Sequence, residues 1–390
     1  MNDMTQDKQH SRPNVPPLRF PGFTEPWQRT KLGSLTTKVG SGSTPRGGNS
    51  VYTTSGHCFV RSQNVGMGNL LLDDIAYIDE QTHQKQKSTE IKENDVLLNI
   101  TGASIGRTAL ATKEIDGGNV NQHVCIIRPS ERVIPNFICY YIQLSKTQRY
   151  IQSLQTGGSR EGLNFDQVRS FPISYPNYYE QIKVVQLLDL IDRRIAVQNK
   201  IIEDLRQLKS ALYQQVFSSI NGKLVALKTV ANIIKGKQIN GTELSESGPY
   251  YVMNGGIVPS GYYDECNTKA NTISISEGGN SCGYVQYNNM PFWSGGHCYT
   301  LNLKSDIVLR YLFHFLKYHE QDIMALRIGS GLPNIQKKDL ERFQILLPNQ
   351  EKQRYCANIF DCIEAKETID VALLKVYQSQ NQFLLQQMFI

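Results

Sequence analysis

The chain contains an internal repeat, and the repeat constrains the fold more than any other feature of the sequence. Residues 171–181 match residues 343–353, with Phe, Ile, Pro, Asn and Gln at the same places and a shift of 172. At the same shift, residues 212–217 (LYQQVF) align with residues 384–389 (LLQQMF) without a gap. A repeat of this kind encodes one structural unit twice, so the sequence predicts two related halves.

Weaker matches continue upstream in collinear order. His123 aligns with His297 at a shift of 174, and residues 101–106 align with 278–283 at a shift of 177. Further upstream the shift grows to 195, where a Leu-x-x-Leu segment beginning at Leu32 meets a Leu-x-x-Val segment beginning at Leu227. The first copy therefore carries extra residues, which we expect in loops between about 40 and 100. The predicted order is a variable half, a long segment, a variable half and a second long segment.

The two long segments have the spacing of helices that pair. From Val184 to Val216 the apolar residues recur at intervals of three, four and seven, interrupted only by Gln198 and Lys209. A helix of roughly 38 residues is about 57 Å long at ~1.5 Å per residue, and one small domain cannot bury it. The second segment runs from about Gln350 to Phe389.

We expect the two helices to pair antiparallel, as a two-fold relation between the repeats demands, with one globular half at each end. The second helix has a polar gap at 364–368, which would weaken the pair or bind a partner protein. The alternative is two separate surface helices, each packed on its own half. The residues predicted to pair are Val184, Leu188, Ile191, Ile195, Ile202, Leu205, Leu212, Ile359, Ile363, Leu374, Tyr377 and Leu384.

Each globular half is rich in short β-favouring runs separated by glycine turns. Each also has one helical stretch, 135–144 and 308–316, which we align at the shift of 172. The predicted class is α+β: two α/β domains in tandem, each followed by a long helix, with the helices paired as an antiparallel coiled coil of pseudo-two-fold symmetry. The predicted boundaries are a flexible tail (1–17), a first domain (18–175), a central helix (176–221), a second domain (222–348) and a C-terminal helix (349–390).

Composition narrows the class of protein. The 390 residues fit two to three domains, and 40% hydrophobic with 19% charged residues excludes wholesale disorder. No apolar run approaches the ~18 residues that span a bilayer, and the polar N-terminal segment has no apolar core typical of a secretory signal. Eight cysteines without a C-x-x-C pair favour a reduced, cytoplasmic protein.

The sequence has no recognisable catalytic device. It contains no phosphate-binding G-x-x-x-x-G-K-[ST] loop, no G-x-G-x-x-G that opens a helix and no H-E-x-x-H. Cys58 follows a histidine, but nothing fixes a third member of a catalytic triad. His314 and His319 lack a flanking ligand. We therefore expect neither a catalytic residue nor a metal site.

Polar loops beside scattered basic residues offer the side chains that bond DNA phosphates and base edges. The net charge of +6 is compatible with a polyanionic partner without being diagnostic of one. His123 and His297 are equally consistent with structural histidines and with a binding face. The candidate DNA-binding residues are Ser43, Thr44, Arg46, Arg61, Asn64, Ser104, Arg107, Gln122, His123, Arg160, Lys235, Lys237, Asn254, Ser276, Asn280, Ser281, His297 and Arg327.

Three motifs resemble one known family. They are the opening LRFPGFTEPWQRTKLG at 18–33, the Pro-x-x-x-Glu-Gln pattern of Pro176, Glu180 and Gln181, and the Leu-x-Gln-Gln-x-Phe endings of both long segments. Together with the repeat, they resemble the specificity subunits of type I restriction–modification systems from residue 18 onward.

That resemblance implies two target-recognition domains, each reading one half of a bipartite, asymmetric DNA sequence, with the paired helices as a spacer. Half-sites about one DNA turn (~34 Å) apart lie on the same face of the duplex. The resemblance also implies a non-catalytic chain that docks two methyltransferase subunits, which bind S-adenosylmethionine and methylate adenine. Motor–endonuclease subunits that use ATP and Mg complete the restriction complex, and no cofactor is expected in this chain.

Two other classes of function stay open at the level of sequence. One is a self-contained DNA methyltransferase or nuclease, which needs a cofactor motif that the sequence lacks. The other is a bilobed adaptor that binds proteins or glycans. Such an adaptor would bind its ligand with an affinity independent of salt, whereas DNA binding weakens as the salt concentration rises.

Overall fold

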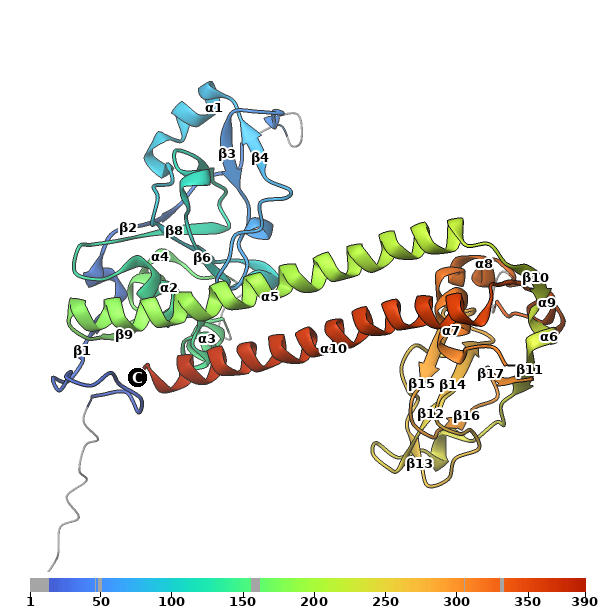
Figure 1. Ribbon diagram of the computed structural model, residues 1–390. Helices are drawn as coiled ribbons and strands as arrows, with labels where there is room; N and C mark the ends of the chain where they lie inside the picture. The colour runs from blue at the N-terminus through green and yellow to red at the C-terminus, as the bar shows by residue number, and fades with distance from the viewer. Residues whose placement is uncertain (1–13, 46, 48–50, 156–161, 305, 330–332) are drawn as a thin grey trace, which may run out of the picture. The chain divides into compact units, whose positions relative to one another are not determined.

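The computed structural model of the chain contains two compact units (Figure 1). The first comprises Met1–Val197 and Leu374–Ile390, and the second comprises Gln198–Leu373. Two long helices, α5 (Tyr178–Ser219) and α10 (Gln350–Gln387), each contribute to both units. The structure describes residues 14–45, 47, 51–155, 162–304, 306–329 and 333–390.

The first unit is built on three small sheets. Strand β1 (Gln28–Lys31) pairs antiparallel with β9 (Pro172–Tyr175). A four-stranded sheet has the order β2 (Thr36–Ser41), β8 (Val124–Pro129), β5 (Val96–Asn99), β6 (Thr108–Leu110), and a three-stranded sheet the order β4 (Ala76–Ile78), β3 (His57–Val60), β7 (Asn119–Val120). The helices are α1 (Glu80–Lys85), α2 (Pro135–Gln143), α3 (Ser145–Ser153) and α4 (Phe165–Arg169), with 3-10 turns η1 (Leu32–Leu35), η3 (Ser62–Asn64), η4 (Lys87–Thr89), η5 (Gly102–Ser104) and η6 (Lys113–Ile115).

The second unit has the same three sheets in the same order. Strand β10 (Lys223–Ala226) pairs with β18 (Gln344–Leu347). The four-stranded sheet is β11 (Ala231–Lys235), β17 (Cys298–Leu303), β14 (Thr272–Ser276), β15 (Val285–Asn288), and the three-stranded sheet is β13 (Tyr262–Tyr263), β12 (Tyr250–Met253), β16 (Trp293–Ser294). Its helices are α6 (Leu227–Val230), α7 (Leu309–Tyr318), α8 (Glu320–Ala325) and α9 (Lys337–Arg342), and its described residues also include the 3-10 turn η7 (Gly241–Glu243).

The strand registers establish the repeat at the level of single residues. Lys31 pairs with Pro172 in the first unit, and Ala226 pairs with Gln344 in the second. Ala226 is therefore equivalent to Lys31 at a shift of 195, and Gln344 is equivalent to Pro172 at a shift of 172. The four-stranded sheets repeat in the same way: their registers place β14 against β5 at a shift of 177, and β17 against β8 at 174. The shifts found in the sequence for the upstream matches are therefore the shifts of the sheets.

The helical stretches of the two halves do not align at 172 as predicted. The backbone N–H of Ile134, which precedes α2, donates to the side-chain oxygen of Gln181, and the backbone N–H of Val308, before α7, donates to Gln353, each at 2.9 Å. These equivalent bonds place α2 and α7 at a shift of 174. The prediction was wrong by two residues because the apolar pattern of a helix repeats closely enough to match at several offsets.

The extra residues of the first copy lie where the sequence predicts them. The shift is 193 at β3 and 177 at β5, so most of the difference falls between Val60 and Val96. This segment contains β4 and α1. Strand β4 corresponds to β13 of the second unit, whereas α1 has no counterpart between β12 and β14, so the insertion leaves the shared sheets unchanged.

The helices α5 and α10 run antiparallel in the first unit. The side-chain amide of Asn381 donates to Asp192 at 2.7 Å, and the guanidinium of Arg194 lies 6.0 Å from the centre of the Tyr377 ring. Residue numbers rise along α5 as their partners fall along α10, which is the direction that the repeat predicts.

The second unit contains the same antiparallel pair, and here the polar interruptions find partners. Gln198 donates to the backbone carbonyl of Asp370 at 3.3 Å, and Lys209 pairs with Glu364 at 2.7 Å. Arg206 pairs with the neighbouring Glu367 at 2.7 Å. The polar gap at 364–368 is therefore part of the helix pairing, where it meets cations of α5, and the expectation that it weakens the pair is not supported.

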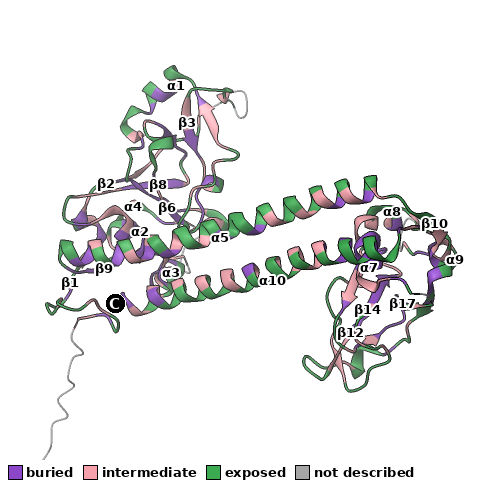
Figure 2. Ribbon diagram, viewed as in Figure 1, coloured by how far each residue is buried: buried purple, intermediate pink, exposed green. Residues whose placement is uncertain are grey.

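The residues predicted to pair are buried to different degrees along the two helices (Figure 2). Val184, Leu188 and Ile191 lie in the core of the first unit together with Leu384, and Ile202 is buried in the second unit. The remaining members are half-buried: Ile195, Leu205, Leu212, Ile359, Ile363, Leu374 and Tyr377.

The repeated Leu-x-Gln-Gln-x-Phe motif places a phenylalanine in each core. In the second unit, the Phe217 ring lies 6.0 Å from that of Tyr311 and 5.6 Å from that of Phe360. In the first unit, the Phe389 ring lies 5.0 Å from that of Phe137, and Trp27 packs beside both. Each motif thus fixes the end of a long helix into a globular core. Within the described ranges, every helix is too short or too polar to cross a bilayer.

Replacing Phe360 by alanine tests this packing. Phe360 is fully buried among aromatic rings, so Phe360→Ala should lower the free energy of unfolding by about 3–5 kcal/mol. Phe383 lies on the same helix with 56% of its surface exposed, and Phe383→Ala should change stability by no more than about 0.5 kcal/mol. Urea denaturation followed by circular dichroism measures both. Equal effects of the two substitutions would contradict the assigned core.

Candidate nucleic-acid interface

The loops at one end of the first unit's sheets enclose a surface hollow of about 460 Å³. Residues after β5, including Thr101 and Ser104, form one side, and η3 forms another. Arg107 and His123 complete the wall. Strand ends bring these residues together because the strands themselves are buried and the polar loops that connect them remain at the surface.

Two side chains of this hollow differ in how firmly they are held. The imidazole of His123 shares a hydrogen bond with the Thr101 hydroxyl, and its backbone N–H donates to Asn121 at 3.0 Å. Arg107 is exposed, and no acidic residue of the described chain pairs with its guanidinium. His123 is therefore both a positioned histidine and a wall residue, while Arg107 is exposed and has no ion-pair partner among the described residues.

The second unit has a hollow of about 670 Å³. Its walls include five of the candidate residues: Lys235, Asn254, Asn280, Ser281 and His297. Glu277 also lines it, and the Lys235 ammonium pairs with one of its carboxylate oxygens at 2.6 Å. Asn254 accepts a hydrogen bond from the backbone N–H of His297 at 3.2 Å and fixes the rim of the hollow.

The two hollows occupy equivalent places in the repeat but differ in chemistry. Ser104 corresponds to Ser281 at the shift of 177, and His123 corresponds to His297 at 174. The first hollow contains Arg107, a cation without an acidic partner among the described residues. The second contains the acid Glu277 and the cation Lys235. The two copies of the repeat thus present different hydrogen-bond donors and acceptors at equivalent positions.

Other predicted residues lie outside the hollows. Arg61 is engaged by the carboxylate of Asp74 at 3.2 Å. Asn64 is buried and donates to the carbonyl of Leu71 at 2.9 Å. Ser276 is also buried, and its hydroxyl donates a hydrogen bond to the carbonyl of Gly255 at 2.6 Å. The polar groups of Asn64 and Ser276 are satisfied internally, so both leave the candidate set.

The remaining candidates are exposed or lie where nothing can be described. Ser43, Thr44, Gln122, Lys237 and Arg327 are exposed. Arg46 and Arg160 are outside the described residues, as is most of the predicted N-terminal tail, residues 1–13.

Glu277 was missed by the analysis of the sequence, which favoured cations and amides as DNA ligands. The repeat offered a signal that could have found it: at the shift of 177, Glu277 aligns with Ile100, so an acid replaces an apolar residue in an otherwise shared frame.

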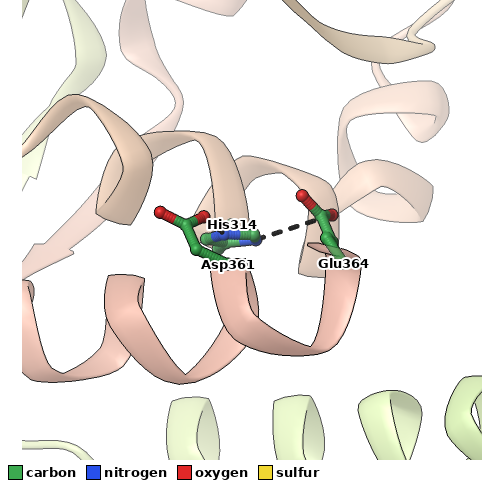
Figure 3. Close-up of side chains that lie close together, drawn as sticks. All are labelled: His314, Asp361 and Glu364. Carbon is green, nitrogen blue, oxygen red and sulfur yellow. Dashed lines mark hydrogen bonds and ion pairs between the residues drawn. The ribbon is translucent and has the colours of Figure 1, made fainter. Parts of the chain in front are cut away.

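A second polar cluster, which shares no residue with the hollows, lies where α7 packs on α10 (Figure 3). His314 Nε2 is 2.8 Å from a carboxylate oxygen of Asp361, and its Nδ1 is 4.0 Å from Glu364. These three residues could offer a metal three ligand atoms within 4.8 Å of one another. However, Arg310 contacts both carboxylates at 2.6 Å, and Lys209 contacts Glu364 at 2.7 Å. Two cations already neutralise the site, which connects α5, α7 and α10.

Burial and ion pairing shift the pKa values in this cluster. Burial lowers the pKa of His314, which the bond to Asp361 only partly offsets. Burial acts to raise the pKa of Glu364 and Asp361, but hydrogen bonds outweigh it and lower both: those of Lys209 on Glu364, and those of Arg310 and His314 on Asp361. The stable form is therefore two carboxylates beside an uncharged imidazole.

Comparison of sequences connects the chain to one family. The family described as "Type I restriction modification DNA specificity domain" matches it twice, over residues 24–207 and 221–374. A type I specificity subunit of Mycoplasma genitalium is 33% identical over 150 residues, which are 37% of this chain and 39% of that protein. The MjaX specificity subunit of Methanocaldococcus jannaschii is 20% identical over 367 residues, 82% of this chain and 85% of the relative. The match thus spans about two fifths of the Mycoplasma relative.

Comparison of structures shows the same fold. The S subunit of a type I restriction–modification system from M. genitalium superimposes with a TM-score of 0.70 at 18% identity, covering 96% of this chain and 99% of that one. A chain from a structural study of complex assembly and conformational transition in a type I system has a TM-score of 0.56 at 18% identity, covering 93% and 97%.

The charged cluster predicts how stability depends on pH. Because the pKa of His314 is lowered by folding, the unfolded chain binds a proton at a pH where the folded chain does not. This contribution to stability is present above the ordinary pKa of 6.5 and is lost as the pH falls below it towards the folded pKa. The free energy of unfolding should therefore decline from about pH 7 to about pH 5 in urea denaturation. His314→Gln, which stays uncharged, should flatten that decline, whereas His319→Gln should not; equal slopes in all three proteins would contradict it.

Proposed function

Because the chain belongs to the type I restriction–modification DNA specificity family, we propose that it recognises a bipartite, asymmetric DNA sequence with its two repeated domains. One observation carries the proposal: two hollows at equivalent positions present different side chains. A symmetric protein would read two copies of one half-site, whereas different chemistry in one frame suits two different half-sites.

The reading parts in this proposal are the domains of residues 18–175 and 222–348. The helical segments 176–221 and 349–390 are the shared parts, and we propose that they set the separation of the half-sites. Both hollows are formed by loops, are open to the surface and carry exposed hydrogen-bonding side chains such as Arg107 and His297. Side chains of these types contact phosphates and base edges.

We further propose that the chain itself contributes no catalytic residue. In this proposal it docks two methyltransferase subunits that bind S-adenosylmethionine and methylate adenine, and motor–endonuclease subunits that use ATP and Mg join them. The similarity to a chain from a study of type I complex assembly supports a role in such a complex. The sequence supports it through the absence of a cofactor-binding motif.

Apolar side chains on the outer faces of α5 and α10 support the docking of partner subunits. The first unit exposes Leu190 and Val197 of α5, and the second exposes Tyr355 and Ile369 of α10, each with more than half of its surface accessible. In the part of α10 that belongs to the second unit, Tyr355 and Ile369 are fourteen residues apart, and in the part that belongs to the first unit, Val376 and Phe383 are seven apart. Because both spacings are multiples of seven, each pair forms an apolar stripe on one side of the helix within its own unit.

Apolar stripes of this kind are costly to leave in water and mark interaction sites. A helix of a partner subunit can cover such a stripe with apolar residues at the same spacing. We therefore assign the outer face of α10 to a methyltransferase subunit.

The contribution of the first hollow can be tested in a reconstituted complex with methyltransferase subunits. Sequencing of the methylated DNA should reveal two separated groups of specified bases. Arg107→Ala should relax one position of the half-site read by the first domain by roughly 5–150-fold, the range of one good base contact, and leave the other half-site unchanged. Arg149→Ala removes an exposed arginine of α3 outside the hollow and should leave both half-sites intact. One contiguous motif, or methylation by the chain without partners, would refute the proposal.

The docking face can be tested separately. Val376→Asp places a charge in the apolar stripe of the first unit and should weaken binding of a methyltransferase subunit at least about tenfold. Gln378→Asp introduces the same side chain on another face of α10 and should bind like the unchanged protein. Isothermal titration calorimetry measures both. Unchanged binding by Val376→Asp would remove the stripe from the interface.

A further inference from the structure

The second hollow contains a carboxylate whose backbone is held firmly in place. Glu277 directly follows strand β14. Its backbone N–H donates to the carbonyl of His297 at 2.9 Å, and its carbonyl accepts from the N–H of Ile335 at 2.8 Å. Both bonds involve only main-chain atoms, so the position of Glu277 does not depend on its side chain.

The same main-chain hydrogen bonds recur beside the first hollow, where the equivalent position holds an apolar core residue. The N–H of Ile100 donates to the carbonyl of His123 at 2.9 Å, and the carbonyl of Ile100 accepts from Leu163 at 2.8 Å. Ile100 is buried, with 4% of its surface exposed. The repeat thus keeps the geometry of this position and changes a hydrocarbon into a carboxylate.

The two oxygens of the Glu277 carboxylate are in different environments. Oε1 accepts hydrogen bonds from the Lys235 ammonium at 2.6 Å and from the Tyr299 hydroxyl at 2.9 Å. Oε2 is buried and has no hydrogen-bond partner among the described residues. Nδ1 of His297 lies 3.8 Å from Oε2, and the side chain of His297 is 61% exposed. A movement of this histidine at the rim would open Oε2 to the hollow.

A buried carboxylate oxygen without a donor is costly, typically by 1–3 kcal/mol or more for a charged group. A ligand that brings an N–H donor into the hollow would remove that cost. In DNA, the donors of the major groove are the exocyclic amino groups of cytosine and adenine, and acidic side chains accept from them. A phosphate cannot take this role, since it offers acceptors and a negative charge.

We propose that Glu277 selects an amino-bearing base, cytosine or adenine, at one position of the half-site read by the second domain. This inference rests on the proposed function and adds the chemistry of one contact. Ile100 cannot accept a hydrogen bond at the equivalent position, and the first hollow presents Arg107, an exposed side chain of a type that suits guanine. The proposal therefore predicts that the two half-sites differ at the base position that faces Glu277 in the second domain and Ile100 in the first.

A simpler role for Glu277 would be to orient Lys235 towards a phosphate. The two roles give different results, because a phosphate contact affects all DNA sequences alike and lowers the salt dependence of binding, whereas a base contact affects one position.

The test uses the complete chain assembled with its methyltransferase subunits and a DNA library randomised in the second half-site. Glu277→Gln keeps an acceptor but loses the charge and adds a competing donor. It should reduce discrimination at one position, where cytosine or adenine is required, by roughly tenfold, and leave the first half-site unchanged. Glu246→Gln removes the same charge from an exposed site of the same unit outside the hollow and should change neither half-site.

A second measurement keeps the proposal testable if Glu277→Gln assembles poorly. The unchanged complex is offered DNA in which each cytosine or adenine of the second half-site is replaced, one at a time, by an analogue without the exocyclic amino group. Binding should fall roughly tenfold at one position. Unchanged binding at every position would overturn the proposal, as would a uniform loss of affinity in Glu277→Gln with a reduced salt dependence. If the unchanged complex modifies DNA without any sequence preference, both the proposed function and the role of Glu277 are refuted. If Glu277→Gln keeps the sequence preference of the unchanged complex, only the role of Glu277 is refuted.

Discussion

Each unit of this protein is completed by the end of a long helix. Residues of α5 near its C-terminal end, Tyr213 and Phe217, belong to the core of the second unit. Leu384, Met388 and Phe389, at the end of the chain's other long helical segment, belong to the core of the first. Because aromatic and aliphatic side chains of this size supply much of the stability of a small core, neither globular part holds its full apolar core without a helix end contributed from elsewhere in the chain.

The repeat preserves this architecture while its polar contacts differ. In the second unit, His314 meets Asp361 and Glu364, with Lys209 and Arg310 as counter-charges. At equivalent positions of the first unit, the Tyr140 hydroxyl lies within hydrogen-bonding distance of Asp189, at 2.8 Å, and of Asp192, at 2.6 Å. Asn381 supplies the contact that Lys209 supplies in the other copy. One copy thus uses neutral donors and the other uses cations for the same helix contacts.

The sequence predicted the features that depend on periodicity. The repeat, the two helices and their direction follow from the apolar spacing around Val184 to Val216 and from the matched segments that flank it, because those patterns depend on the backbone. Features that depend on local surroundings were less predictable. Asn64 has the chemistry of a DNA ligand, but its amide satisfies a buried turn, and nothing in the residue type distinguishes these two uses. Glu277 was not predicted as a site residue because its proposed role depends on a carboxylate oxygen without a hydrogen-bond partner among the described residues, which only the three-dimensional structure reveals.

The packing of Phe389 against Trp27 and Phe137 has a consequence for biosynthesis. Trp27 leaves the ribosome early, whereas Phe389 is added more than 300 residues later. At roughly 5–20 residues per second, the first domain waits tens of seconds for the side chains that close its core. During that interval, Trp27 and Phe137 lack the aromatic ring that packs on both of them in the folded chain.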